Sequence, residues 1–229
     1  YASAIDALAH LHRLDARVAL PASLPPYDER RLLDEALLLV DWYRPAALGE
    51  PTSEQAREAY IAAWREALSW ATRQPPTLVL RDFHVDNLMR LPDREGLAGC
   101  GLLDFQDALA GPAAYDVMSL LEDARRDIAE DLRQAMLARY HEALGTRDRD
   151  EFDRVFAILA AQRHAKVIGI FTRLAVRDGK PRYLEHIPRV WRLLEQAVAR
   201  EPALGPVAAW LDRHLPPPTR GIPPWPTTP

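Results

Sequence analysis

The segment Leu78–Asn87 reads LVLRDFHVDN, and the segment Leu102–Asp107 reads LLDFQD. In each segment an apolar run leads to a carboxylate, Asp82 in the first and Asp104 in the second, and Asn87 follows Asp82 by five residues. Two buried strands that each deliver a carboxylate to a loop, with an amide oxygen between them, are what phosphoryl transfer from a magnesium nucleotide requires. The pattern therefore predicts a kinase-type catalytic loop followed by a metal-binding loop.

Each of the three polar residues has a chemical role in this prediction and a structural alternative. Asp82 is the candidate catalytic base, which would accept a hydrogen bond from the acceptor hydroxyl. Asn87 and Asp104 offer a neutral and a charged oxygen, the hard ligands that Mg²⁺ prefers. The structural alternatives are a turn-capping carboxylate for Asp82, an Asx turn for Asn87, and pairing of Asp104 with Arg81 or with a backbone amide.

His84 allows a different chemistry, because His84, Asp82, Asp86 and Asp104 could form the metal site of a hydrolase. No second histidine lies nearby at the spacing of a metal ligand; the next ones along the chain are His141 and His164. We therefore expect His84 to shape the catalytic loop through hydrogen bonds.

Other charged residues near the motifs have less specific interpretations. Asp86 is equally plausible as a residue that approaches the metal and as a surface charge. Asp107 is equally plausible as a contributor to metal or phosphate chemistry and as a turn residue. Asp116 is expected at the N-cap of the next helix, where it would tie that helix to the catalytic loop. Arg81 and Asp116 are thus candidates, with His84, for support of that loop.

The segment Gln162–Arg173 reads QRHAKVIGIFTR and is unusually charged for a buried helix. Arg163, His164 and Lys166 interrupt a strongly apolar pattern, and Arg163 and Lys166 share a face because they are three residues apart. These three residues are candidates for contact with an anionic substrate. Salt bridges are the more frequent fate of such charges.

Composition narrows the class of protein. The 229 residues carry a net charge of −4, which gives no attraction to nucleic acid or to an anionic membrane. Cys100 is the single cysteine, so an internal disulfide is impossible and a reducing compartment is expected. The first residues have helical periodicity and lack the features of a signal peptide. The sequence contains no run of about 18 consecutive apolar residues, so no membrane span is predicted. We expect a cytoplasmic protein.

Hydrophobic periodicity predicts a mainly helical α+β fold in which a small β-hairpin and loop platform carries the candidate residues. Residues 215–229 contain seven prolines and should be extended, lying on a surface or disordered. Helices are predicted near 5–12 and at 28–43, 54–71, 117–126, 128–144, 149–176, 187–199 and 207–214. Strands are predicted at 77–80, 88–91 and 99–103, and a loop at 44–51.

Several motifs resemble one known family. RDFHVDN, LLDFQDA and GPAAYD resemble the catalytic core of the aminoglycoside phosphotransferase family, which is related to the protein kinases. SLLEDARRD, QRHAKVIGIFTRL and RDGKPRYLEHIPR look closest to the bacterial N-acetylmuramate/N-acetylglucosamine anomeric kinases of cell-wall recycling. The resemblance runs from about Tyr1 to Ala199, and the two short catalytic motifs carry most of its specificity.

The resemblance implies that residues 1–214 form the C-terminal lobe of a protein-kinase-like fold, with a catalytic loop at 80–91, a metal loop at 102–108 and a separate tail at 215–229. It implies Asp82 as catalytic base and Asn87 and Asp104 as Mg²⁺ ligands. It also implies ATP as donor and the C1 hydroxyl of an amino sugar as acceptor.

The sequence departs from the family pattern in two ways. Leu80 stands where the family usually has a histidine, two residues before the catalytic aspartate. No glycine-rich loop or strand lysine precedes the motifs, since the two lysines are Lys166 and Lys180. We therefore expect the N-terminal nucleotide lobe to be absent from these residues, supplied in cis or by another chain, and the chain alone to be inactive.

Three alternatives stay open: an aminoglycoside or choline-type kinase, a non-catalytic binding lobe, and the metal-dependent hydrolase. An aminoglycoside is polycationic and would require an acidic substrate face. If the Arg163 and Lys166 cluster lines the pocket, it favours a sugar that bears a carboxylate, such as N-acetylmuramate.

Overall fold

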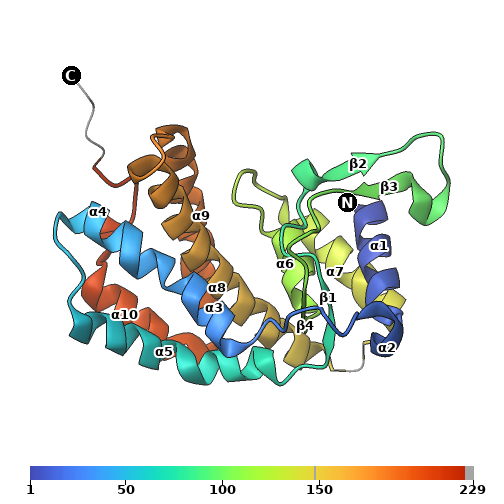
Figure 1. Ribbon diagram of the computed structural model, residues 1–229, viewed down its shortest axis with the longest axis horizontal. Helices are drawn as coiled ribbons and strands as arrows, with labels where there is room; N and C mark the ends of the chain where they lie inside the picture. The colour runs from blue at the N-terminus through green and yellow to red at the C-terminus, as the bar shows by residue number, and fades with distance from the viewer. Residues whose placement is uncertain (147, 225–229) are drawn as a thin grey trace. The chain divides into compact units, whose positions relative to one another are not determined.

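The computed structural model describes residues 1–146 and 148–224 and divides into two compact units (Figure 1). Unit 1 comprises Tyr1–Asp28 and Thr72–Phe156, and unit 2 comprises Glu29–Ala71 and Ala157–Pro229. The chain is mainly helical with two small sheets, which confirms the fold class expected from the sequence.

Unit 1 contains both sheets. Strand β1 (Pro76–Val79) pairs antiparallel with β4 (Leu109–Pro112), and β2 (Leu88–Arg90) pairs antiparallel with β3 (Cys100–Leu102). The helices of unit 1 are α1 (Ala2–Arg13), α2 (Ala16–Ala19), α6 (Ala114–Leu121), α7 (Glu130–Leu144) and the first part of α8 (Arg149–Val176), with the 3₁₀ turns η2 (Val85–Asn87) and η3 (Gly96–Gly99). Helix α1 packs on α7 and contacts β1, so the first helix lies beside the strand that leads to residue 80.

Strand β4 was not predicted, because its residues Leu-Ala-Gly-Pro have low strand propensity. Its pairing depends on residues distant in sequence. The backbone N–H of Tyr27 donates to the Ala110 carbonyl at 2.8 Å, and Ala110 N–H donates to Pro25 at 2.9 Å. A Cβ atom on Gly111 would lie 2.8 Å from the Cβ of Tyr27, so this close approach requires glycine.

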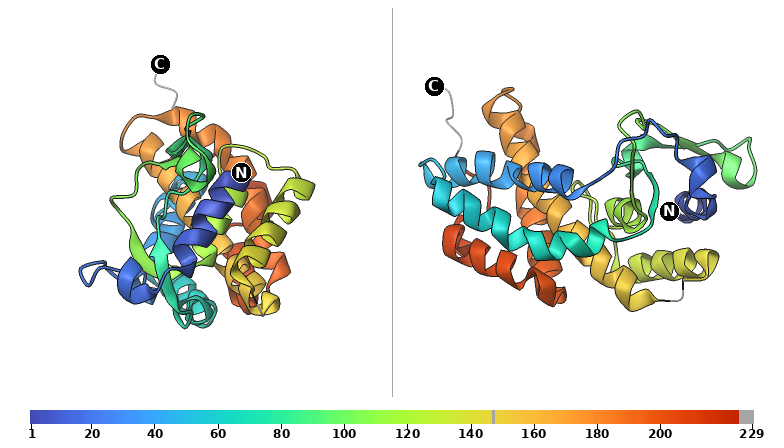
Figure 2. Two further views of the ribbon diagram at one scale, coloured as in Figure 1. Left: turned by 90° about the vertical axis from the view of Figure 1, so that its right-hand side faces the viewer. Right: turned by 60° about the horizontal axis from the view of Figure 1, so that its bottom comes forward.

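The described residues of unit 2 form helices and turns. They are α3 (Glu29–Ala36), the π-helical turn η1 (Leu39–Tyr43), α4 (Arg44–Leu48), α5 (Glu54–Thr72), the larger part of α8, η4 (Pro181–His186), α9 (Ile187–Arg200), η5 (Pro202–Leu204), α10 (Gly205–His214) and η6 (Pro217–Thr219). Helices α5 and α10 lie side by side (Figure 2), and Trp210 Nε1 donates to the Ala56 carbonyl at 2.9 Å. The rings of Tyr60 and Trp210 are 4.6 Å apart, so aromatic packing joins the same two helices.

The helix predicted at 28–43 is interrupted and then continues through the expected loop. After α3 the chain forms the π-helical turn and then α4, so the predicted loop at 44–51 was wrong for residues 44–48. A Cβ atom on Gly169 would lie 2.2 Å from the Leu38 carbonyl carbon, which shows how closely α8 approaches the backbone just before the π turn. Such tertiary contacts are not visible in a local pattern.

Two helix boundaries also differ. Helix α6 covers 114–121 where 117–126 was predicted, and α7 begins at Glu130 where residue 128 was predicted. Asp123 Oδ1 accepts a hydrogen bond from the backbone N–H of Arg125 at 2.8 Å. This Asx turn competes with helical hydrogen bonding and accounts for the early end of α6.

Helix α8 is long and apolar enough to cross a bilayer by length and composition, with a mean hydropathy of 1.2 over an 18-residue window. In the structure 94% of that window is buried inside the protein, as expected of a core helix. Its composition is therefore weak evidence for a membrane span.

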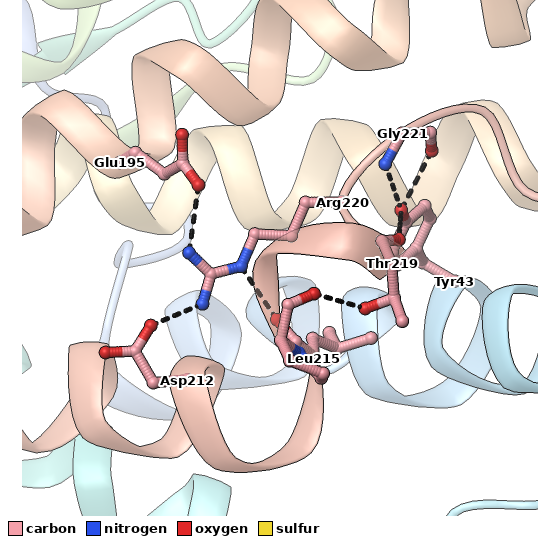
Figure 3. A network of polar contacts seen from close by, with 8 residues as sticks. Tyr43, Glu195, Asp212, Leu215, Thr219, Arg220 and Gly221 are labelled. Carbon is pink, nitrogen blue, oxygen red and sulfur yellow. Dashed lines mark hydrogen bonds and ion pairs between the residues drawn. The ribbon is translucent and has the colours of Figure 1, made fainter.

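Within unit 2, the proline-rich tail contacts α9 and α10 through Arg220 (Figure 3). The guanidinium lies 2.9 Å from Glu195 Oε1 on α9 and 2.6 Å from Asp212 Oδ1 on α10, and its Nε donates to the Leu215 carbonyl at 2.7 Å. This part of the tail lies against α9 and α10, as expected, but Pro217–Thr219 forms the 3₁₀ turn η6, so the prediction of an extended chain was wrong there.

Tyr43 makes a second contact with the tail (Figure 3). Its hydroxyl lies 2.6 Å from the Thr219 carbonyl and accepts a hydrogen bond from Gly221 N–H at 2.9 Å. Burial raises the pKa of Tyr43 to about 12, so the phenol stays protonated at neutral pH. The prediction of an extended or disordered tail falls outside the described residues at 225–229.

Candidate active site

The loop at 80–91 begins where strand β1 ends, and Asp116 fixes that point. Asp116 is fully buried in the first turn of α6. Its two carboxylate oxygens accept hydrogen bonds from the backbone N–H groups of Leu80, at 2.6 Å, and Arg81, at 2.9 Å. Asp116 therefore links α6 to the loop, although it lies inside the helix and the predicted N-cap position is wrong.

Backbone strain is concentrated in the two predicted loops. Within residues 1–146 and 148–224, the non-glycine residues with positive φ are Arg81, at 69°, and Asp104, at 59°. The Asp82 N–H donates to the Leu80 carbonyl at 2.9 Å, which closes a tight turn around Arg81. Such conformations cost about 1–3 kcal/mol each and persist only where the surrounding structure imposes them.

Asn87 connects the two loops. Its Nδ2 donates to the backbone carbonyl of Asp82 at 2.9 Å and lies 3.3 Å from Asp104 Oδ2. The Leu103 N–H donates to the Asn87 carbonyl at 2.9 Å, which extends the pairing of β2 with β3. The structure thus brings the predicted residues Asp82, Asn87 and Asp104 together.

The side chains of Asn87 and Asp104 carry oxygen atoms of the kind that Mg²⁺ prefers. The Asn87 amide nitrogen is held by the Asp82 carbonyl, so Oδ1 is the atom that would bind a metal. Asp104 is exposed, and its Oδ1 accepts a hydrogen bond from Gln106 Nε2 at 2.5 Å. One amide oxygen and one carboxylate suit an ion that keeps water and phosphate as its other ligands.

His84 lies buried against the Asn87 amide, with 3.5 Å between His84 Nε2 and Asn87 Nδ2. Its backbone N–H donates to the Asp82 carbonyl at 3.1 Å. These contacts suit the expected role in shaping the loop. The hydrolase alternative required a cluster of metal ligands around His84, and no group of three or more His, Cys, Asp or Glu side chains suited to a metal is found in the described part of the chain.

Arg126 is a neighbour of the loop that the sequence analysis missed. Its Nη2 lies 2.7 Å from Asp86 Oδ1, and its Nε lies 3.4 Å from Asp123 Oδ2. Asp86 therefore takes part in an ion pair between the loop and the segment after α6. Residue 126 is 40 positions from residue 86, so no local pattern indicates the contact. Asp107 is exposed in the second loop.

Arg163, His164 and Lys166 are buried in α8 within unit 2, whereas the two loops belong to unit 1. Lys166 Nζ lies 2.9 Å from Glu35 Oε1, so this lysine has the salt bridge that the sequence analysis gave as the frequent alternative. A role of these three residues in substrate binding stays a prediction.

A cavity of about 820 Å³ lies between α1 and the β2–β3 hairpin in unit 1. Val85 lines it from η2, and Leu88, Met89 and Cys100 line it from strands β2 and β3. The half-exposed Met89 side chain gives the cavity an apolar wall next to the candidate residues.

Comparison with proteins of known sequence finds relatives that are named as kinases. A kinase from Caulobacter vibrioides named N-acetylmuramate/N-acetylglucosamine kinase is 36% identical over 225 residues, covering 96% of this chain and 61% of the relative. A kinase of the same name from Pseudomonas aeruginosa is 39% identical over 211 residues, covering 88% of this chain and 59% of the relative. The chain therefore spans about three fifths of the length of these relatives.

Solved structures show the same fold. The GDP complex of aminoglycoside 2'-phosphotransferase-IIIa superposes with a TM-score of 0.53 at 20% identity, covering 86% of this chain and 63% of that protein. The ADP-bound aminoglycoside phosphotransferase APH(2'')-Ib gives a TM-score of 0.51 at 20% identity, covering 87% and 64%. A family model matches residues 1–155, the stretch that holds both loops and Asp116, and the chain belongs to the phosphotransferase enzyme family.

Proposed function

We propose that the protein carrying this chain transfers a phosphoryl group from ATP to a hydroxyl of a small molecule. The first acceptors to consider are N-acetylmuramate and N-acetylglucosamine, at the anomeric hydroxyl, because these sugars appear in the names of the relatives. The observation that carries the proposal is the position of Asn87, whose amide contacts both the Asp82 carbonyl and the Asp104 carboxylate. A catalytic base and two metal-binding oxygens on adjoining loops are the parts that this reaction needs.

Asp82 is the proposed catalytic base. It would accept a hydrogen bond from the acceptor hydroxyl and take its proton as the phosphoryl group is transferred. The buried Asp116 carboxylate holds the two residues before Asp82, and Asn87 holds its backbone carbonyl. A base fixed on both sides loses little freedom when substrate binds, which favours a productive alignment.

Asn87, through Oδ1, and Asp104 would hold Mg²⁺. When bound, this ion would neutralise charge on the transferring phosphates. Asn87 also keeps the two loops at a fixed separation through its amide nitrogen. Arg81 and His84 support the same loop, and Asp86 and Asp107 are candidates for contact with the substrate.

The nucleotide-covering lobe is proposed to lie outside these 229 residues, in cis or on another chain, and the chain alone is proposed to be inactive. The greater length of the relatives leaves room for such a lobe. We propose that the reaction takes place in the cytoplasm, as a step of cell-wall recycling. The single cysteine fits a reducing compartment, and the cytoplasm supplies ATP.

The test uses ³¹P NMR to monitor phosphoryl transfer by the full-length protein from MgATP to four acceptors: N-acetylmuramate, N-acetylglucosamine, an aminoglycoside and choline. We expect a sugar-1-phosphate signal, and Asp82→Asn should lower kcat by about 10²–10⁴-fold. The control is Asp93→Asn, which changes an exposed aspartate in the turn between β2 and β3.

Transfer to choline or an aminoglycoside alone would replace the proposed acceptor. No transfer to any acceptor, together with no binding of MgATP, would leave the non-catalytic binding lobe as the better interpretation.

A further inference from the structure

His12 is a partly buried side chain of α1 that contacts two other elements of unit 1. Its Nδ1 lies 2.6 Å from the hydroxyl of Tyr140 on α7, and its Nε2 lies 3.3 Å from the backbone carbonyl of Leu78 on β1. The rings of His12 and Tyr140 pack edge to face with centroids 5.9 Å apart. One imidazole therefore joins α1, α7 and β1.

The partners define the protonation state of the ring. A carbonyl oxygen can only accept, so Nε2 carries the hydrogen that is donated to Leu78. In the neutral imidazole Nδ1 must then accept from the Tyr140 hydroxyl. Burial lowers the pKa of His12 to about 4, which keeps the ring neutral and this arrangement intact at neutral pH.

Leu78 lies two residues before Leu80, where the strained turn begins. The backbone N–H groups of Leu80 and Arg81 donate to the Asp116 carboxylate, and Arg81 has a φ of 69°. A non-glycine residue keeps such a conformation only when its neighbours are fixed by the surrounding structure. His12 fixes the strand two residues before Leu80, so the turn that presents Asp82 is held at two points.

We propose that His12 is a positioning residue, which holds the end of β1 so that Asp82 is presented to the acceptor hydroxyl. The proposal deepens the proposed function and rests on it for its kinetic consequence. Its structural consequence, the rigidity of residues 80–82, does not depend on any activity. The two can therefore fail separately.

The experiment compares four variants of the full-length protein. His12→Leu removes both hydrogen bonds, and His12→Gln keeps an amide donor that can reach the Leu78 carbonyl. Tyr140→Phe removes only the hydroxyl that donates a hydrogen bond to Nδ1 of His12. The matched control is Arg139→Ala, which breaks the exposed ion pair of Arg139 with Asp6, at 2.6 Å between the same two helices, without touching β1.

Two measurements are made at neutral pH: amide hydrogen exchange of residues 80–82, and the separate kcat and KM values for phosphoryl transfer. Loss of one hydrogen bond of ordinary strength corresponds to about a tenfold effect. We expect His12→Leu to speed exchange at residues 80–82 about tenfold and to lower kcat about tenfold, with KM changed less than about threefold. His12→Gln should restore both values, and Tyr140→Phe should give a smaller change in the same direction.

The proposal is overturned if exchange at residues 80–82 in His12→Leu equals that in Arg139→Ala, or if His12→Gln fails to restore it. Should the wild-type protein transfer no phosphoryl group, the proposed function fails, and the exchange data alone decide whether His12 fixes the turn. If His12→Leu does not fold, exchange at residues 80–82 in Tyr140→Phe and His12→Gln decides the question in the same way.

Discussion

Replacing Arg220 with alanine should loosen the packing of the tail on unit 2. The Arg220 side chain is only 9% exposed and contacts two carboxylates and one backbone carbonyl. Its guanidinium also lies 5.5 Å from the centre of the Trp191 ring, close enough for a cation–π contact. The substitution therefore removes several contacts that join α9, α10 and the chain after Leu215.

The magnitude depends on what each partner loses. The Glu195 and Asp212 side chains are 43% and 70% exposed, so water replaces most of their lost interaction and each ion pair contributes about 1 kcal/mol or less. Leu215 is fully buried, and leaving its carbonyl without this donor costs about 1–3 kcal/mol. We expect the free energy of unfolding to fall by about 2–4 kcal/mol when the terms are combined.

Urea denaturation followed by circular dichroism measures this change. Arg220→Lys keeps the charge without the planar fork and should lose part of the stability. The matched control is Arg213→Ala, because Arg213 is an exposed arginine on α10, and its effect should stay within about 0.5 kcal/mol. If Arg220→Ala is no more destabilising than Arg213→Ala, the reasoning about the buried guanidinium is refuted.

Two further predictions concern unit 1. Asp116→Asn keeps the shape of the side chain but replaces one accepting oxygen with a donor that faces a backbone N–H. The free energy of unfolding, measured by urea denaturation, should therefore fall by about 2–3 kcal/mol. A change within experimental error would contradict this expectation. Burial lowers the pKa of His12 to about 4 from its usual 6.5, so its stabilising contribution is fully present above about pH 6.5 and is lost as the pH falls through 4. Between pH 7 and pH 4.5 the free energy of unfolding should fall by about 2 kcal/mol more in the wild type than in His12→Gln, and equal losses in both proteins would argue against a neutral imidazole at His12.

The two loops could be predicted from the sequence because the relevant signals are local. Apolar runs followed by polar residues placed Asp82, Asn87 and Asp104 at strand ends, and β2 and β3 lie within about one residue of their predicted ranges. Helix α8 matches its prediction because its apolar pattern continues over 28 residues.

Contacts between distant parts of the chain could not be predicted. Strand β4 forms because Tyr27 and β1 lie on either side of it, and neither is near it in sequence. Arg126 reaches Asp86 from a segment that was predicted to be helical but lies beyond the end of α6 in the structure. The buried charge of Lys166 was visible in the sequence, whereas its partner Glu35 on α3 was not.

The pairing of Leu88 with Leu102 has a consequence for how this chain can change length. A residue inserted into β2 or β3 would shift the register and turn every following side chain to the opposite face, separating Asn87 from Asp104. The turn between the strands is exposed at Asp93 and Glu95 and can absorb an insertion without moving either residue. Natural variation in length, and any engineered epitope or label, should therefore be tolerated between these strands and not within them.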